Sequence, residues 1–288
     1  MTLPRFIAQP GSSSSERILA VEGRLHSFPL VAEAGVLLLE AIRRGFAAEG
    51  FTSGIVELAD VGLSPFAYVM PALSETPKHA AFYSTTFRPE GISRVKTGAL
   101  TFGTRDDSPF FHCHALWLEA DGKVSGGHIL PEETVIAETV TVQAFGLCGA
   151  GFQGKADPET NFKLFEPVAS GSSGRTAGSR AYAIRLRPNQ DYAAALERFC
   201  AERGITSARV IGGVGSTIGA IFSDGRMVEN FATEIYLRKG IVRQDHVGSP
   251  VAELDISLVD YTGAVAEGRL KHGDNPVLMT IELVLEEL

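Results

Sequence analysis

The chain has 288 residues, a formal net charge of −8 and a pI near 5.4, and 44% of its residues are hydrophobic. This composition is typical of a globular protein with room for two hydrophobic cores, and it excludes a disordered chain. The acidic charge argues against broad binding to a nucleic-acid backbone, because such binding needs clustered Lys and Arg.

The three cysteines, Cys113, Cys148 and Cys200, are widely spaced and form no CxxC pattern. This predicts free thiols in a reducing compartment, without a disulfide framework or a cysteine-based zinc finger. The N-terminus has no signal-peptide layout, and no apolar run approaches the length of a membrane span. We therefore expect a cytoplasmic protein that does not enter the membrane.

The first half of the chain predicts strands, one amphipathic helix and two irregular stretches. The helix is predicted from apolar residues at helical spacing, and Gly50 is expected to end it. Four prolines predict the first irregular stretch, and Gly and Pro predict the second. In chain order, we expect a strand at 18–21, the helix at 32–49, a strand at 52–59, an irregular excursion at 64–92, a strand at 139–145 and an irregular segment at 146–168.

Three of the seven histidines lie between Phe111 and Leu130. His112 and His114 alternate with other residues as in a β-strand, so both side chains are expected on one face. The same alternation turns Cys113 away from them, and we interpret this cysteine as a small core residue.

The loop of the predicted hairpin decides where the third histidine lies. A three-residue loop, Ala120-Asp121-Gly122, sets His128 directly opposite His114. A two-residue Asp-Gly turn would instead oppose His128 to Ala115 and turn it to the other face. A bulge at Gly126-Gly127 would also shift the pairing. We prefer the first register, because it brings three imidazoles together.

Three converging imidazoles point to a metal site. Neutral imidazole is the commonest protein ligand for zinc and similar divalent ions. Three histidines with an open fourth position are typical of a catalytic or exchangeable site. The sequence therefore predicts that His112, His114 and His128 bind a divalent metal ion, with zinc preferred; the alternative is three unrelated structural histidines.

Other polar residues are weaker candidates. His79 is either a fourth ligand or a surface histidine, and Glu132, Glu133 and Glu138 are either groups that orient a ligand or ordinary surface carboxylates. The glycine-rich segment at 212–216 lacks the Gly-Lys-Ser/Thr ending of a phosphate loop, so we expect no nucleotide cofactor there.

The second half repeats the pattern of predicted elements of the first half, after a linker at 169–179 rich in Gly and Ser. A strand at 180–186 and a helix at 191–203 ending at Gly204 repeat the earlier order. At a shift of 141 residues, the hairpin positions Gly122, Val124 and Gly127 align with Gly263, Val265 and Gly268. We therefore predict two similar domains, at 1–168 and 178–288.

The alignment also predicts a chemical difference between the copies. His112, His114 and His128 correspond to Glu253, Asp255 and Arg269. Two carboxylates beside an arginine indicate an internal ion pair, so we expect the second domain to lack the histidine ligands and the metal.

Both halves resemble the PPC family, the plants-and-prokaryotes-conserved domain. The residues that carry the resemblance are His112-Cys-His114, Asp121-Gly-Lys-Val124, Gly126-Gly-His128 and Val140-Thr-Val142 in the first half, and Ala208-Arg-Val-Ile211, Gly213-Val-Gly-Ser216 and Asp260–Val265 in the second. The resemblance implies an α+β fold, with an antiparallel sheet packed with helices in each of two PPC-like domains. It also implies a homo-oligomer, preferably a trimer, and a metal held by histidines at these positions.

Two functional classes stay open at this point. The first is an oligomeric metal-binding protein with a regulatory role, associated with DNA through partners; direct DNA contact is doubtful, because the chain has no Arg-Gly-Arg-Pro core of an AT-hook. The second is a metal-dependent enzyme that acts on a small polar molecule through the three histidines.

Overall fold

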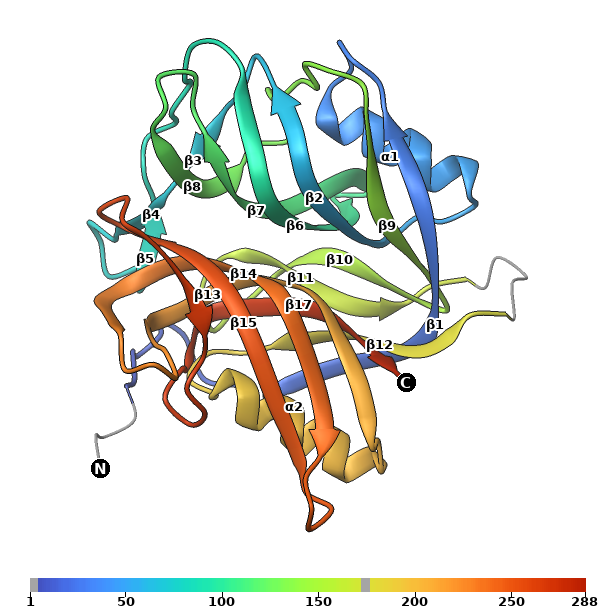
Figure 1. The fold of residues 1–288 in the computed structure, drawn as a ribbon. Coiled ribbons are helices and arrows are strands. Elements are labelled where there is room, and N and C mark those ends of the chain that lie inside the picture. The colour runs from blue at the N-terminus through green and yellow to red at the C-terminus, as the bar shows by residue number, and fades with distance from the viewer. Residues whose placement is uncertain (1–4, 172–176) are drawn as a thin grey trace.

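The computed structural model describes residues 5–171 and 177–288. They form an α+β protein dominated by antiparallel strands, with one helix in each half (Figure 1). The first half contains β1 (Ile18–Ala32), α1 (Leu38–Ala48), β2 (Gly54–Leu63), β3 (Tyr68–Val69), β4 (Pro71–Leu73), β5 (Ala81–Tyr83), β6 (Ser93–Arg105), β7 (Ser108–Leu118), β8 (Val124–Ile129), β9 (Val140–Cys148), β10 (Ala150–Ala156) and β11 (Lys163–Ala169). The second half contains β12 (Ser179–Leu186), α2 (Tyr192–Arg203), β13 (Ser207–Ile221), β14 (Met227–Gln244), β15 (Pro250–Asp260), β16 (Val265–Arg269) and β17 (Val277–Glu287).

The two halves repeat one strand order. Neighbouring strands run β1-β9-β2-β6-β7-β8 in the first half and β12-β17-β13-β14-β15-β16 in the second. In each half a helix follows the first strand of this set. The repeated order is the one that an internal duplication predicts. The first half additionally carries β3 to β5, which lie between its helix and the β7–β8 hairpin, and the β10–β11 hairpin.

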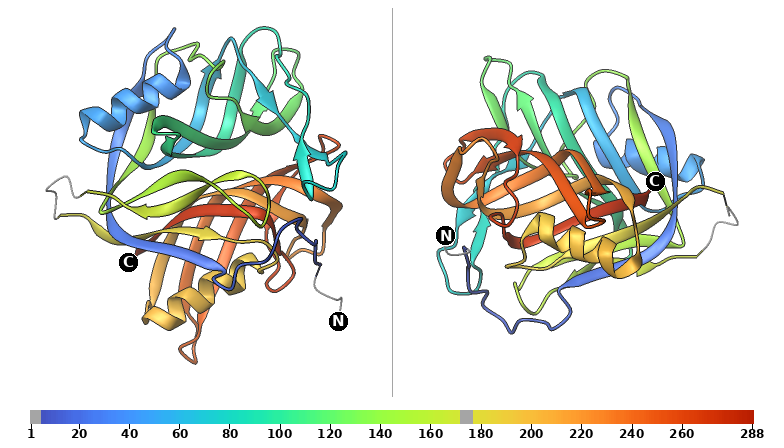
Figure 2. Two further views of the ribbon diagram at one scale, coloured as in Figure 1. Left: turned by 180° about the vertical axis from the view of Figure 1, so that it is seen from behind. Right: turned by 60° about the horizontal axis from the view of Figure 1, so that its bottom comes forward.

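Strand β1 joins the two halves into one sheet. Its residues Ile18–Leu25 pair with β12 of the second half, and Arg24–Ala32 pair with β9 of the first. The strand can be followed from the lower half to the upper half in Figure 1, and Figure 2 shows it from two further sides.

Three hydrophobic clusters make up most of the core. Each half has its own core beneath its helix, with Phe46 buried in the first and Phe199 in the second. A third cluster lies between the halves, where Ile55 and Phe145 pack with Ile211. The apolar faces of the two halves of the sheet pack on each other here, and this packing removes both faces from water. The junction between the halves is therefore a buried layer.

Helix α1 is shorter than the sequence predicted. Ala32 still belongs to β1, and Gly35 turns the chain with a φ of +79° before the helix begins at Leu38. The predicted end is correct, because Gly50 has a φ of +76°, the left-handed conformation that glycine adopts without steric cost.

Helix α2 agrees with its prediction at both ends. The side chain of Asp191 caps its start by accepting a hydrogen bond from the backbone N–H of Ala194 at 2.9 Å. Gly204 ends it in the left-handed conformation, with a φ of +66°. The predicted strand before it is confirmed as β12.

The prediction of an irregular segment at 146–168 is wrong. Strand β9 continues to Cys148, and the β10–β11 hairpin fills most of the remainder. Its glycines serve close packing, because a Cβ atom at Gly151 would lie 3.1 Å from Ser53 and one at Gly154 would lie 3.1 Å from Arg105. The prediction of an irregular segment treats these glycines as turn signals, whereas they permit two strands to approach closely.

The remaining sequence expectations concern connections. The excursion at 64–92 contains the short strands β3, β4 and β5. The predicted linker is flanked by the end of β11 and the start of β12, and its residues 172–176 lie outside the described residues. All three cysteines are buried. In the part of the chain that the structure describes, no helix is long and apolar enough to cross a membrane.

Candidate metal centre

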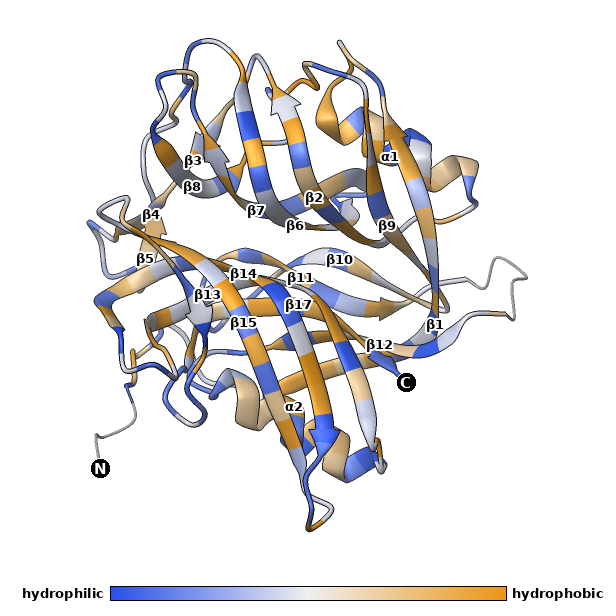
Figure 3. Ribbon diagram, in the orientation of Figure 1, coloured by the Kyte–Doolittle hydropathy of each residue, from blue (hydrophilic) through white to orange (hydrophobic). Residues whose placement is uncertain are grey.

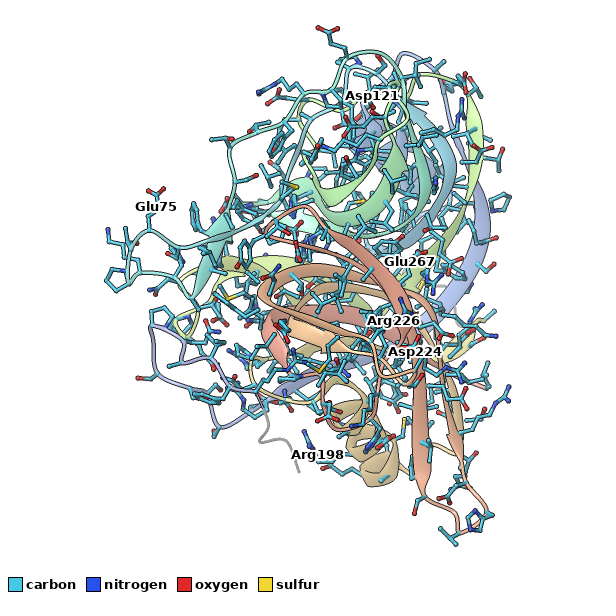
Figure 4. All side chains as sticks on the ribbon, turned by 60° about the vertical axis from the view of Figure 1, so that its left-hand side comes forward. Glu75, Asp121, Arg198, Asp224, Arg226 and Glu267 are labelled. Carbon is cyan, nitrogen blue, oxygen red and sulfur yellow. The ribbon has the colours of Figure 1, made fainter. Side chains whose placement is uncertain are left out.

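The β7–β8 hairpin has the register that a three-residue loop predicts. His114 lies directly opposite His128, and Gly122 closes the loop with a φ of +89°. The backbone N–H of Glu119 donates to the carbonyl of Lys123 at 2.8 Å, and the pairing continues without a bulge to His128. The alternative two-residue turn is therefore wrong. Figure 3 shows hydrophilic and hydrophobic residues mixed along the strands of both halves, and Figure 4 labels Asp121 in the loop between β7 and β8.

The structure brings the three predicted histidines together. Ligand atoms of His112, His114 and His128 all lie within 4.8 Å of one another. The Nε2 atoms of His112 and His114 are 3.1 Å apart. Two nitrogens bound to one tetrahedral zinc ion at ordinary bond lengths are separated by about 3.3 Å. The spacing of the cluster is therefore close to that of ligands around one ion.

Hydrogen bonds on the far side of two rings fix their tautomers. His114 Nδ1 is 2.9 Å from the backbone carbonyl of Ile235, which can only accept, so this nitrogen carries the proton. His112 Nδ1 is hydrogen-bonded to the carboxylate of Glu282. When both rings are neutral, their protons therefore lie on Nδ1, and the Nε2 lone pairs of the two rings face each other. The two lone pairs repel each other, whereas a cation bound between them would attract both.

Two buried carboxylates of the second half lie beside the histidines. Glu234 on β14 is 5% exposed, and its Oε1 atom is 3.8 Å from Nε2 of His114. Glu282 on β17 is fully buried against His112. Neither forms an ion pair with Lys or Arg among the described residues, and three of their four oxygens have no hydrogen-bond partner there. A buried carboxylate without a partner costs free energy, so a cation bound between these groups would stabilise them.

Burial also sets the protonation of the cluster. Burial, followed by the charges of neighbouring histidines, lowers the pKa of His114 well below its ordinary value. Burial, the charge of His112 and that of Arg105 do the same to the pKa of His128. Both rings are therefore neutral near neutral pH, which is the form that binds metals. His128 Nδ1 is buried and has no hydrogen-bond partner, so it too is available.

Two cavities meet at His112. The first, of about 60 Å³, is lined by His112, His114 and Glu234. The second, of about 260 Å³, is lined by His112 and His128. Tyr83 on β5 lines both. A small molecule in the larger cavity would reach two of the three imidazoles.

The remaining candidates from the sequence lie elsewhere. His79 is not part of the histidine cluster; its Nδ1 atom is 3.2 Å from the carbonyl of Thr160. Glu133 and Glu138 form surface ion pairs with arginines, whereas Glu132 lines the larger cavity. The glycine-rich segment at 212–216 lies within β13, which agrees with a packing role.

The equivalent positions of the second half form the predicted ion pairs. Arg269 Nη1 is 2.7 Å from the Glu253 carboxylate, and its Nε is 3.2 Å from the Asp255 carboxylate. Asp255 and Arg269 are direct partners in the β15–β16 hairpin, as His114 and His128 are in the β7–β8 hairpin. The two hairpins thus share one scaffold with different chemistry.

Sequence reasoning missed Glu234 and Glu282. Each lies in a strand between apolar neighbours, within Ala232–Leu237 and within Val277–Leu285. A glutamate at an inward position of a buried strand is rare unless it has a partner. That pattern was a usable signal, although it could not reveal that the partner lies in the other half.

The comparisons with known proteins concern the second half most directly. Residues 173–288 match the Plants and Prokaryotes Conserved (PCC) domain. This match covers the second half of the chain and part of the linker. The strand order of the second half is the one that the first half repeats. No curated protein matches the sequence.

Solved structures similar to this chain each cover about half of it. A plant- and prokaryote-conserved (PPC) protein from Pyrococcus horikoshii is 19% identical, with 55% of this chain and 100% of that chain covered and a TM-score of 0.40. A metal-containing protein from Archaeoglobus fulgidus is 20% identical, with 49% and 92% covered and a TM-score of 0.39. A protein from Salmonella is 12% identical, with 51% and 96% covered and a TM-score of 0.39.

Proposed function

We propose that this chain binds a divalent metal ion, zinc in the first place, through His112, His114 and His128, and that it acts as a metal-dependent enzyme on a small polar molecule. The observation that carries the proposal is that the Nε2 atoms of His112 and His114 lie 3.1 Å apart beside two buried carboxylates. A divalent cation satisfies all of these groups at once, and its charge balances that of Glu234 and Glu282.

The chain's own residues prepare the site for the ion. The carbonyl of Ile235 and the carboxylate of Glu282 hold two imidazoles with Nε2 turned inward. Glu234 is a candidate for the fourth position. A metal ion bound here supplies a Lewis acid that polarises a carbonyl or activates water. The 260 Å³ cavity favours a small molecule over a nucleic acid, because a duplex cannot enter it. A regulatory role through DNA-bound partners is the alternative.

The same reasoning gives the two domains different tasks. We place the metal in the domain at 1–168, and we assign to the domain at 178–288 the support of that site rather than a metal of its own. In the second domain Arg269 occupies the position of His128, and a fixed positive charge there repels a cation. The full chain should therefore bind one metal ion.

Metal content is the test of this proposal. The wild-type protein should contain about one zinc ion per chain by elemental analysis, and His114→Ala should lose most of it, because three ligands are needed for a stable site. His246→Ala is the matched control, since His246 is exposed and lies far along the chain from the cluster. Equal zinc content in wild type and His114→Ala would remove His114 from the site.

A further inference from the structure

The 260 Å³ cavity has a cationic wall. Arg105 and Lys163 line it together with His112 and His128, and Glu132 is the acidic residue among its lining side chains. Lys163 is already paired with Asp106 at 2.6 Å. The guanidinium of Arg105 has no hydrogen bond or ion pair to another side chain among the described residues. Its guanidinium lies over the ring of Phe110, 5.0 Å from the ring centre.

Three strands hold Arg105 in this place. It is the last residue of β6 and pairs with Ser108 across a two-residue turn, in which Asp106 and Asp107 have φ values of 52° and 59°. On its other side it pairs with Gly154 of β10. A side chain at Gly154 would meet the stem of Arg105 at 3.1 Å, so the glycine leaves the arginine its room. The position is built by backbone pairing and does not depend on a flexible loop.

The charge of Arg105 also reaches the histidines. The side chain of Arg105 lines the same cavity as His112 and His128. An unpaired guanidinium and the metal ligands therefore share one cavity. The planar fork of arginine matches the two oxygens of a carboxylate or a phosphate.

Resting on the metal centre proposed above, we infer that this cavity binds a small organic anion. Its carboxylate or phosphate pairs with Arg105, and its uncharged end reaches the ion held by His112 and His128. The volume of about 260 Å³ lies just below the range of about 300–1,000 Å³ for ordinary small-molecule sites. The occupant is accordingly small, and its single anionic group pairs with the guanidinium of Arg105, because Lys163 is already paired with Asp106.

Calorimetric titration of the full chain, zinc-loaded and metal-free, tests the inference with three probes. Lactate carries a carboxylate, phosphoglycolate adds a phosphate, and lactamide is the uncharged analogue of lactate. The variants are Arg105→Met, which removes the charge, and Arg105→Lys, which keeps the charge without the fork. Arg44→Met is the control, because Arg44 is an exposed residue of α1. Zinc content and thermal unfolding of each variant are measured alongside.

We expect at least one of the two anions to bind zinc-loaded wild type, and Arg105→Met to bind it about ten- to hundredfold more weakly. Arg105→Lys should be intermediate, Arg44→Met should equal wild type, and lactamide should not distinguish the proteins. Preference for phosphoglycolate over lactate would identify the anionic group as a phosphate.

Equal anion affinity in wild type and Arg105→Met, or no binding of either anion to the zinc-loaded protein, would overturn the inference while leaving the metal proposal intact. A wild-type protein without zinc overturns the metal proposal instead. Binding to metal-free protein that still depends on Arg105 would then retain the anion site but remove its connection to an ion.

Discussion

His112 on β7 and Glu282 on β17 are hydrogen-bonded across the junction of the two halves. Glu282 is fully buried and the His112 side chain is 13% exposed, and the contact joins a proposed ligand in one half to a carboxylate in the other. The second half has no histidines at the equivalent hairpin positions, yet it orients a histidine of the first. Both halves therefore contribute residues to one site: the first half supplies the histidine, and the second half supplies the carboxylate that orients it.

Replacement of Glu282 tests that division. Glu282→Gln keeps an acceptor of similar shape and removes the negative charge that makes His112 a stronger ligand. We expect zinc affinity to fall about 10- to 100-fold while the stoichiometry is kept. Competition with a coloured chelator measures the affinity. Glu287→Gln, on the same strand but paired with Arg180 at the surface, should leave it unchanged; an equal loss in both variants would mean that the effect is not specific to the site.

Glu234 should make opposite contributions with and without the metal. Its carboxyl group is buried with no ion pair to Lys or Arg among the described residues. Burial raises its pKa well above the ordinary value, and the nearby backbone N–H of His128 lowers that pKa only in part. Glu234→Gln removes the carboxyl group whose ionisation burial penalises, so the metal-free protein should unfold at higher denaturant concentration than wild type. The same variant should gain less stability from added zinc. Urea unfolding with and without zinc measures both effects, with the exposed Glu229→Gln as control. A destabilised metal-free Glu234→Gln would contradict the proposed role.

The sequence predicted the histidine hairpin well because short-range rules govern it. Strand alternation puts His112 and His114 on one face, and the Ala120–Gly122 loop fixes the residue opposite His114. The duplication was predictable for a similar reason, since Gly50 and Gly204 end the two helices in the same conformation. Local geometry repeats wherever the local sequence does.

The contacts between the halves were not predictable from the sequence. Glu234 reaches the cluster only because the sheets pack face to face, and no local rule sets that packing. The β10–β11 hairpin was missed because Gly151 and Gly154 serve close approach between strands, whereas glycine more often marks turns. The unpredictable part of the site is thus the part that belongs to tertiary structure.

Self-association remains a prediction. The strand path ends at β3 and β16, and unpaired edge strands favour pairing or covering by another chain. Leu73, Phe82 and Phe87 are exposed near β3 to β5. We expect a homo-oligomer, with a trimer of about three times the chain mass of 30.7 kDa preferred. Light scattering on a size-exclusion column measures the mass; a particle of the single-chain mass at micromolar concentration would contradict the prediction.

A buried ion-pair network holds the β10–β11 hairpin against the second half. Arg185 on β12 is fully buried and contacts Asp157 at 2.6 Å and Glu166 at 2.8 Å. Arg187 contacts Asp157 at 2.9 Å. The loop of this hairpin leads directly into Lys163, which lines the proposed anion cavity. The network therefore supports both the junction of the halves and one wall of the site.

This network predicts a loss of stability in acid. Burial raises the pKa of Asp157, but the charge of Arg185 and hydrogen bonds from Thr160 and Arg185 outweigh it, so the pKa lies below the ordinary 3.8. A carboxyl group with a lowered pKa stabilises the fold above its ordinary value, and that contribution is lost as the pH falls through the folded value. Metal-free wild type should lose stability from about pH 4 downward. Asp157→Asn should be about 3–5 kcal/mol less stable near neutral pH, because it leaves buried arginines without their partner.

The decisive comparison is the slope of stability with pH. Urea unfolding at about pH 6 and about pH 3 should show a smaller acid-induced loss in Asp157→Asn than in wild type, since the variant has no proton to take up at this position. Asp107→Asn is the control: Asp107 is exposed in the β6–β7 turn, and asparagine tolerates its φ of 59°. It should follow the wild-type slope. Equal acid-induced losses in wild type and Asp157→Asn would show that the buried pair does not govern acid stability.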